Sequence, residues 1–381
     1  MAVYLNQFHV VKPKNCINQN DLLAWIIKCH QEAEVNASPE VPLSSEMIEK
    51  LFLRYGVKSA QIGQRYLECG AISNSGFDGG EIYEISKSQK NGVDITKRTE
   101  FFSSRAFPIF KTFYEGSESA GRPDHIIHVT CTGYVSPSAA QRIVAEESWG
   151  KNTEITHAYH MGCYAAMPAV RIANSLVISE NVNRSNFNVD IVHTEMCALH
   201  MNPLAQTAEQ MVVQTLFADG HIKYTASENP QAAGKNLKII ATYEKVIANS
   251  VQDMSWFPAP WGMQMNLSRE VPGKIKLELK KFSNELFHKA GLELNEAMRS
   301  IFAIHPGGPK IIDAVQDVLE LKDEQVAESK KVLFERGNMS SATLPHVWNE
   351  ILANNYPIGT KVVSYAFGPG LTLFGSVFEV V

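Results

Sequence analysis

The sequence has 381 residues, 45% of them hydrophobic and 20% charged, and its formal net charge is -5. This is the balance of an ordinary globular protein, long enough for one large fold or two similar halves. The charge argues against a nucleic-acid partner, and no apolar run reaches the roughly 18 residues that span a bilayer.

The start of the chain and its cysteines indicate the compartment. Residues 1–11 lack the basic end and long apolar core of a signal peptide and are predicted to form a strand. The six cysteines are scattered, without a CxxC pair or a zinc-like cluster, so we expect no metal site. Because a chain of this length needs no disulfides, we expect a reducing, cytoplasmic location.

The first third of the chain combines helical periodicity with loop signals. Apolar spacing predicts helices over 20–33 and from residue 47. Residues 72–94 are rich in Ser, Gly and Asp and are predicted to form a surface loop. A further helix is predicted over 99–114, although Pro108 lies inside it.

Extended and helical segments then alternate. Residues 126–133 and about 138–147 are predicted to form a strand and a capped helix, and 156–160 a short strand before Cys163. The later segments are a strand over 188–195, a helix over 210–217, a turn at Ala218-Asp219-Gly220 and a strand over 221–226.

The pattern restarts near residue 235. It predicts a strand over 237–246, a helix over 271–290, a strand over 301–304, a helix over 310–319 and a terminal hairpin around Gly368-Pro369-Gly370. Because strands alternate with helices in both halves, the predicted class is α/β with a mixed sheet in each half. We divide the chain into an N-terminal half, 1–235, and a C-terminal half, 236–381.

Cys163 follows Gly162 and opens a run of small, apolar, helix-compatible residues. A thiol at a helix N-terminus meets unpaired backbone N–H groups and the positive end of the helix dipole, and both favour the nucleophilic thiolate. Gly162 has no Cβ and is expected to leave room for a substrate beside the sulfur. The alternative is a buried structural cysteine, since free cysteines are among the most buried residues.

Two distant stretches favour a catalytic role for this cysteine. His305 in Ile304-His305-Pro306-Gly307-Gly308-Pro309 and Asn338 in Gly337-Asn338-Met339-Ser340-Ser341-Ala342 each lie in a loop signal beside an apolar segment. A Cys–His–Asn set can hydrolyse amides. It can also run a decarboxylative Claisen condensation, in which the Cys carries an acyl group and the His and Asn stabilise an enolate. The residue types alone leave both chemistries open.

Four stretches, in this order along the chain, together resemble the chalcone synthase family, the type III polyketide synthases of the thiolase superfamily. They are Gly162-Cys163-Tyr164-Ala165, the stretches around His305 and Asn338, and Phe367-Gly368-Pro369-Gly370-Leu371-Thr372. The β-ketoacyl synthase III enzymes share the fold and the triad but usually carry His-Gln-Ala-Asn and Gly-Asn-Thr-Ser. The resemblance is strongest from Val129 to the C-terminus.

This resemblance implies a thiolase fold of five αβαβα layers, built from two similar halves with mixed sheets, and a homodimer. It implies that Cys163 is the nucleophile, that His305 and Asn338 form the decarboxylation and oxyanion pair, and that Phe217 is a gatekeeping aromatic. An aromatic beside the sulfur excludes water. Two glycines of the matched motifs, Gly308 and Gly370, are also expected at the substrate site.

The chain departs from the family's plant members around the substrate pocket. Cys131 lies where the plant members have a Thr-Thr-Ser-Gly strand end, and Cys197 and His200 take the places of two cavity-shaping threonines. Met265 stands where a second gatekeeping phenylalanine is usual. We expect these residues to bind substrate, with plain packing roles as the alternative for Cys131, Cys197 and His200.

The predicted activity is that of a type III polyketide synthase-like acyltransferase of secondary metabolism. An acyl group from a thioester is loaded on Cys163 and joined to a malonyl- or β-ketoacyl-derived carbanion, with release by cyclisation to a pyrone or resorcinol as one outcome. The rivals are a β-ketoacyl synthase III-like enzyme that condenses once or joins two chains, a Cys–His–Asn hydrolase, and a non-catalytic partner subunit. No metal or organic cofactor is required, since the thioester and the loss of carbon dioxide drive the reaction.

The expected partners are acyl- and malonyl-coenzyme A thioesters, which reach Cys163 through a tunnel. In the resembled family, Lys and Arg on the helix before an Arg-Tyr pair bind the phosphates of coenzyme A. That pair is Arg65-Tyr66 here, and the basic positions fall at about Phe52, Tyr55 and Ser59. We therefore hypothesise that one substrate arrives on an acyl carrier protein; the alternative is ordinary coenzyme A binding by Arg54 and Lys58.

Overall fold

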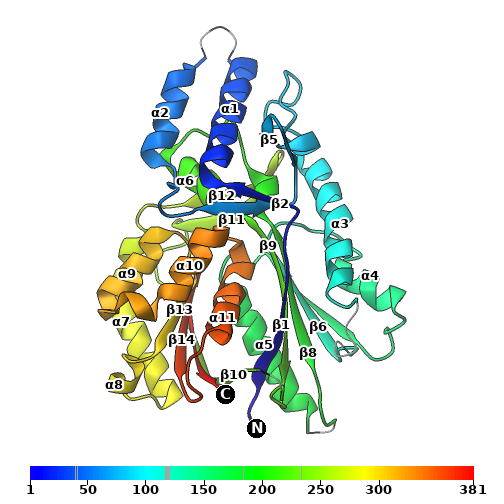
Figure 1. The fold of residues 1–381 in the computed structure, drawn as a ribbon, viewed down its shortest axis with the longest axis vertical. Helices are drawn as coiled ribbons and strands as arrows, with labels where there is room; N and C mark the ends of the chain where they lie inside the picture. The colour runs from blue at the N-terminus through cyan, green and yellow to red at the C-terminus, as the bar shows by residue number, and fades with distance from the viewer. Residues whose placement is uncertain (39, 41, 116–120, 183, 233) are drawn as a thin grey trace.

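The computed structural model (Figure 1) describes residues 1–38, 40, 42–115, 121–182, 184–232 and 234–381. In this part of the chain a nine-stranded sheet has the order β13-β14-β15-β10-β1-β9-β8-β6-β7. Strand β1 (Tyr4–Val11) lies in the middle of this order and joins its two halves. It pairs along β9 (Asp219–Ser227), but meets β10 (Leu237–Val246) only through Tyr4 and Leu5. The two predicted half sheets are therefore continuous with each other.

The N-terminal half sheet is buried on both faces. Its strand β6 (His125–Thr130) runs parallel to β7 (Glu154–Tyr159) and β8 (Val189–Met196), and β8 is antiparallel to β9. Every residue of β6, β8 and β9 is buried, including polar residues of β9 such as Asp219, His221 and Lys223. The covering helices are α3 (Ile95–Thr112), α4 (Ala139–Glu146) and α5 (Ala166–Glu180).

The C-terminal half repeats this plan. Strand β13 (Ile301–Ile304) is parallel to β14 (Lys361–Gly368), and β15 (Thr372–Val380) forms the predicted antiparallel hairpin with β14. The packed helices are α7 (Val271–Ala290), α8 (Leu294–Ala297), α9 (Pro309–Leu319), α10 (Ala327–Arg336) and α11 (Thr343–Ala353).

Three apolar cores separate five layers. Helices α5 and α11 share one core with β6 and β14, so they lie between the two half sheets. A second core joins α7 and α9 to the outer face of the C-terminal half sheet, and a third joins α3 and α4 to the outer face of the N-terminal one. Figure 1 shows α5 and α11 in the middle, with α3 and α4 on one side and α7 and α9 on the other. This is the predicted αβαβα arrangement.

The remaining elements cover one end of the sheet. Helices α1 (Gln19–Ala37) and α2 (Ser45–Tyr55) project at the top of Figure 1. Helix α6 (Ala208–Leu216) lies below them, with the antiparallel pair β2–β3 (Asn15–Asn18, Gln64–Leu67) and the hairpin β11–β12 (Met254–Ala259, Gly262–Leu267). The hairpin β4–β5 (Ala71–Ser73, Gly76–Asp78) belongs to the same end of the chain's fold. No helix of the described residues is long and apolar enough to cross a membrane.

Two local predictions are wrong. The segment 72–94 is not all loop, since it takes part in the β4–β5 hairpin and a turn of 3-10 helix. The predicted turn at 218–220 is instead the start of β9. Gly220 is needed there for a close approach, because a Cβ would lie 2.4 Å from the Met339 sulfur. In the sequence alone, a glycine that lets a strand pack closely against another segment cannot be distinguished from a glycine in a turn.

Candidate active site

Cys163 lies in the loop between β7 and α5 and is 8% exposed. Helix α5 begins at Ala166, so Cys163 lies before its first turn. The sequence had suggested that Cys163 itself opens the helix. The preceding Gly162 has φ 84°, and a Cβ there would lie 2.5 Å from Pro369 Cδ. Gly162 thus makes room for the Gly368-Pro369-Gly370 turn, and it also lines the pocket beside the sulfur. That it leaves room for a substrate stays a prediction.

The environment of the Cys163 sulfur favours the neutral thiol. Burial raises the pKa of Cys163 to about 12, because a thiolate is poorly solvated there, and the charge of Glu195 acts in the same direction. Hydrogen bonds from Ser340 and Asn338 to the sulfur lower this pKa and oppose part of the effect. The expected helix-terminus stabilisation of the thiolate is therefore outweighed by desolvation.

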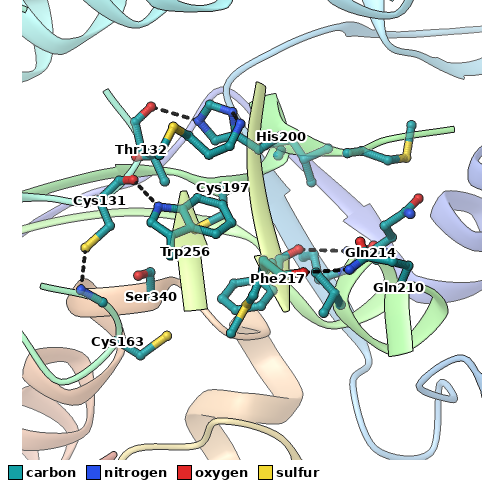
Figure 2. A pocket seen from close by; sticks show the side chains of 18 of the residues that line it. Cys131, Thr132, Cys163, Cys197, His200, Gln210, Gln214, Phe217, Trp256 and Ser340 are labelled. Atoms are coloured by element: carbon teal, nitrogen blue, oxygen red, sulfur yellow. Dashed lines mark hydrogen bonds between the residues drawn. The ribbon is translucent and has the colours of Figure 1, made fainter. Parts of the chain in front are cut away.

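Asn338 is held beside the sulfur by its own loop. Its Oδ1 accepts from the Ser340 backbone N–H at 2.9 Å and from Thr343 Oγ1 at 3.2 Å. Because the oxygen is occupied, the amide N–H group remains for the sulfur or a substrate oxygen. Ser340 has φ 51°, an uncommon left-handed conformation for a non-glycine residue. Figure 2 shows Ser340 next to Cys163.

His305 directly follows β13 and is 1% exposed. Its backbone N–H donates to Tyr365 O at 2.7 Å, but neither ring nitrogen has a hydrogen-bond partner among the described residues. Burial lowers the pKa of His305 to about 3, so the imidazole is neutral at pH 7. A neutral imidazole with free nitrogens can donate one hydrogen bond and accept another.

A narrow pocket opens beside Cys163 (Figure 2). The structure places six of the predicted site residues in its wall: Cys163, Phe217, Met265, Cys131, Cys197 and His200. The other four, His305, Asn338, Gly308 and Gly370, are not among the described residues that line it. The free volume is about 60 Å³, well below the roughly 300–1,000 Å³ of ordinary ligand pockets.

Two of the substituted pocket residues are fixed by backbone hydrogen bonds. His200 Nε2 lies 2.9 Å from Thr132 O, and its Nδ1 accepts from the Met263 backbone N–H at 3.1 Å. This places the proton on Nε2, and burial lowers the pKa of His200 to about 3. The Cys131 sulfur accepts from the Gly162 N–H at 3.0 Å. His200 therefore presents its ring, and not a free nitrogen, to the pocket.

Glu195 connects the two halves behind the pocket. Its carboxylate accepts from the Cys131 backbone N–H at 3.0 Å, from Thr132 Oγ1 at 2.9 Å and from Ser341 Oγ at 2.5 Å. Desolvation raises the pKa of this carboxyl, and the hydrogen bonds oppose that shift. The end of β6 and the loop that carries Asn338 are thus tied to one buried group.

Several pocket residues escaped the sequence analysis. They are Trp256 and Met263 on the β11–β12 hairpin, Arg65 on β3, and Gln210 and Gln214 on α6. The hairpin left a signal, since apolar residues flank Pro260-Trp261-Gly262, a combination typical of a turn between strands. Trp256 Nε1 donates to Cys131 O at 2.6 Å, which fixes the indole over the pocket (Figure 2).

The C-terminal part of the chain matches a known protein family. The family model of the C-terminal domain of chalcone and stilbene synthases matches residues 238–381. Residues 238–381 are therefore similar to the C-terminal domain of the chalcone and stilbene synthases. A curated relative, probable polyketide synthase 1 of Dictyostelium discoideum, is 29% identical over 255 residues, or 66% of this chain. The chain spans only 8% of that relative's length.

Solved structures confirm the predicted thiolase fold. The C-terminal type III domain of Steely1, a type I/III hybrid from Dictyostelium, is 23% identical, with a TM-score of 0.81 over 100% of this chain and 99% of the domain. PKS-I of the brown alga Ectocarpus siliculosus is 22% identical, with a TM-score of 0.82 over 100% and 99%. A type III pentaketide synthase of Neurospora crassa is 20% identical, with a TM-score of 0.79 over 99% of both chains.

Proposed function

We propose that this chain is a condensing acyltransferase of the type III polyketide synthase kind. The observation that carries the proposal is the contact of the buried Cys163 sulfur, in the wall of the pocket, with Ser340 and Asn338. The family match supports the same reaction class. We assign Cys163 as the nucleophile, and His305 and Asn338 as the groups that hold the thioester oxygen of the extender.

The reaction has two covalent stages. The Cys163 sulfur loses its proton and attacks the carbonyl of an acyl thioester, and the carrier thiol leaves with a proton. A malonyl thioester then loses carbon dioxide, and the electron pair of the broken bond moves into an enolate. N–H groups of neutral His305 and Asn338 stabilise the enolate oxygen. The enolate carbon attacks the acyl group, and the Cys163 sulfur leaves. None of these steps requires a metal or organic cofactor.

Mass spectrometry of the intact protein tests the first stage. Incubation with a panel of acyl thioesters should add one acyl mass, and peptide mapping should place it on Cys163. Release of free acid without carbon dioxide would favour the hydrolase, and failure of Cys163 to take up any acyl group would favour a non-catalytic subunit.

The small pocket favours a second candidate within this class, an enzyme that condenses once. A free volume of about 60 Å³ holds little of a long chain. The product mass from one acyl thioester and excess malonyl thioester separates the candidates. A mass increase of one two-carbon unit indicates a single condensation, and larger increases indicate iteration and permit release as a pyrone or resorcinol.

We also propose that an acyl carrier protein delivers one substrate. Phe52, at an expected phosphate-binding position, is fully buried. Lys58 Nζ donates to the backbone oxygens of Phe52 and Leu53 at the end of α2, and the Arg54 guanidinium lies 5.1 Å from the Tyr55 ring. These contacts engage the two cations, Lys58 and Arg54, that were the alternative for binding the phosphates of coenzyme A. Equal or better kcat/KM with coenzyme A for both substrates would contradict this proposal.

The assembly and location extend the same proposal. We propose a homodimer, since β7 is an edge strand of the sheet and Ile178 on α5 is exposed. Light scattering of the purified protein measures the mass of the assembly directly.

The six cysteines are free thiols, which supports the proposed cytoplasmic location. We retain residues 1–235 and 236–381 as the two halves, one carrying Cys163 and the other His305 and Asn338.

A further inference from the structure

Glu195 lies near the end of β8, and its side chain is fully buried. One carboxylate oxygen accepts from the Ser341 backbone N–H at 3.3 Å and from Ser341 Oγ at 2.5 Å. The other accepts from the Cys131 backbone N–H at 3.0 Å and from Thr132 Oγ1 at 2.9 Å. The carboxylate therefore links the end of β6, in the N-terminal half, to the loop after α10, in the C-terminal half.

The Ser341 contacts hold the loop that carries Asn338. Ser340 has φ 51°, a left-handed conformation that a non-glycine residue keeps only where its surroundings fix it. Its backbone N–H donates to Asn338 Oδ1 at 2.9 Å, and its side chain hydrogen-bonds the Cys163 sulfur. Ser341 follows directly, so its two hydrogen bonds to Glu195 fix the chain where this conformation must be held.

The Cys131 contact reaches the proposed nucleophile from the other side. The Cys131 backbone N–H donates to Glu195, and the Cys131 sulfur accepts from the Gly162 N–H at 3.0 Å (Figure 2). Gly162 precedes Cys163 and has φ 84°. Cys163 and Asn338 are therefore each joined to the Glu195 carboxylate by a short series of hydrogen bonds.

We propose that Glu195 is a positioning residue that fixes the Asn338 amide relative to the Cys163 sulfur. Glu195 is not among the described residues that line the pocket, and it acts through Ser341 on one side and Cys131 on the other. A hydrogen-bond donor stabilises an enolate only when it is aimed at the oxygen where charge develops, so a small shift of the loop slows decarboxylation. This inference rests on the proposed condensing function and adds to it a residue outside the pocket.

Glu195→Gln tests the proposal, because either orientation of the new amide turns its NH2 group toward a backbone N–H, that of Ser341 or that of Cys131. In this variant kcat for carbon dioxide release from malonyl thioester should fall about 10- to 100-fold, while KM changes by less than about threefold. Rates are expressed per Cys163 that accepts an acyl group, measured by intact mass, so unfolded protein is not counted. An unchanged kcat per active Cys163 would overturn the inference.

A double-mutant cycle with Asn338→Ala separates positioning from a general loss of structure. If Glu195 acts through the Asn338 amide, Glu195→Gln should slow carbon dioxide release by less than about threefold in the Asn338→Ala background. Losses that multiply in the double variant would overturn the inference. Ser341→Ala removes only one hydroxyl donor to the carboxylate, and it provides the same cycle if Glu195→Gln does not fold.

Glu328→Gln is the matched control. Glu328 is 2% exposed, and its carboxylate accepts from Asn354 Nδ2 at 2.5 Å and from Tyr356 OH at 2.6 Å. It is not among the described residues that line the pocket. This variant should keep the wild-type kcat per active Cys163. A loss equal to that of Glu195→Gln would mean that any buried carboxylate has the same effect, and would overturn the inference.

A crystal structure of Glu195→Gln, or of Ser341→Ala where only that variant folds, decides the inference without measuring activity. Ser340 should leave the left-handed region, and its N–H should separate from Asn338 Oδ1. An unchanged loop would overturn the role of Glu195. Absence of any condensation product from the wild-type protein would instead overturn the proposed function, and the crystal structure would still decide whether Glu195 holds the loop.

Discussion

Phe217 and Asn338 lie on adjacent segments joined as a parallel β-bridge. The Asn338 N–H donates to Leu216 O at 3.0 Å, and the Ala218 N–H donates to Asn338 O at 2.8 Å. One residue comes from the N-terminal half of the chain and the other from the C-terminal half. These two backbone hydrogen bonds therefore fix the proposed gatekeeping ring relative to the proposed oxyanion donor.

Replacement of Cys163 by Ala should abolish condensation and leave the fold intact. The sulfur is the proposed covalent carrier of the acyl group, and loss of one buried atom changes little of the surrounding packing. Product formation is measured by mass spectrometry and folding by circular dichroism. Full product from a pure, folded variant would rule out Cys163 as the nucleophile.

Asn338→Ala and His305→Ala should separate loading from decarboxylation. Both variants should still take an acyl group on Cys163, but release carbon dioxide from malonyl thioester about 10²–10³-fold more slowly, the scale for loss of one oxyanion donor. Labelled carbon dioxide measures the second step and intact mass the first. Wild-type release in either variant would show that its side chain does not hold the enolate.

Alkylation of Cys163 should accelerate with pH. Since the pKa of Cys163 is raised to about 12, the thiolate fraction should grow about tenfold per pH unit between pH 7 and 10. Ser340→Ala removes a hydrogen bond that lowers this pKa, so it should slow alkylation about 2- to 10-fold. Peptide mapping after iodoacetamide treatment measures the rate, with exposed Cys16 as internal reference. A plateau below pH 8 would mean that the thiolate is stabilised after all.

Glu195→Gln should destabilise the fold by about 1–3 kcal/mol, because an amide N–H group would face backbone and hydroxyl donors. Glu244→Gln is the matched control, since Glu244 pairs with Arg171 at a partly exposed position, where an ion pair contributes about 1 kcal/mol or less. Urea unfolding midpoints at constant slope give both values. Equal effects would mean that the buried network carries no special stability.

The sequence by itself determined the resemblance to a family, the layered α/β class and most of the strands and helices. Strands such as β6 and β8 are buried on both faces, so their apolar runs are visible without tertiary information. The motifs around Cys163, His305 and Asn338 are local strings of residues, and local strings can be matched directly. Their proposed roles rest on that match.

Only the tertiary structure decided the electrostatics and the walls of the pocket. The neutral thiol of Cys163 depends on burial by residues from both halves of the chain. The buried Nη2 of Arg65 lacks a partner among the described residues because the carbonyls of Gln214 and Phe217 meet the other donors of this side chain. Desolvation and unmet hydrogen bonds arise from neighbours far away in sequence, and no local pattern of residues records those neighbours.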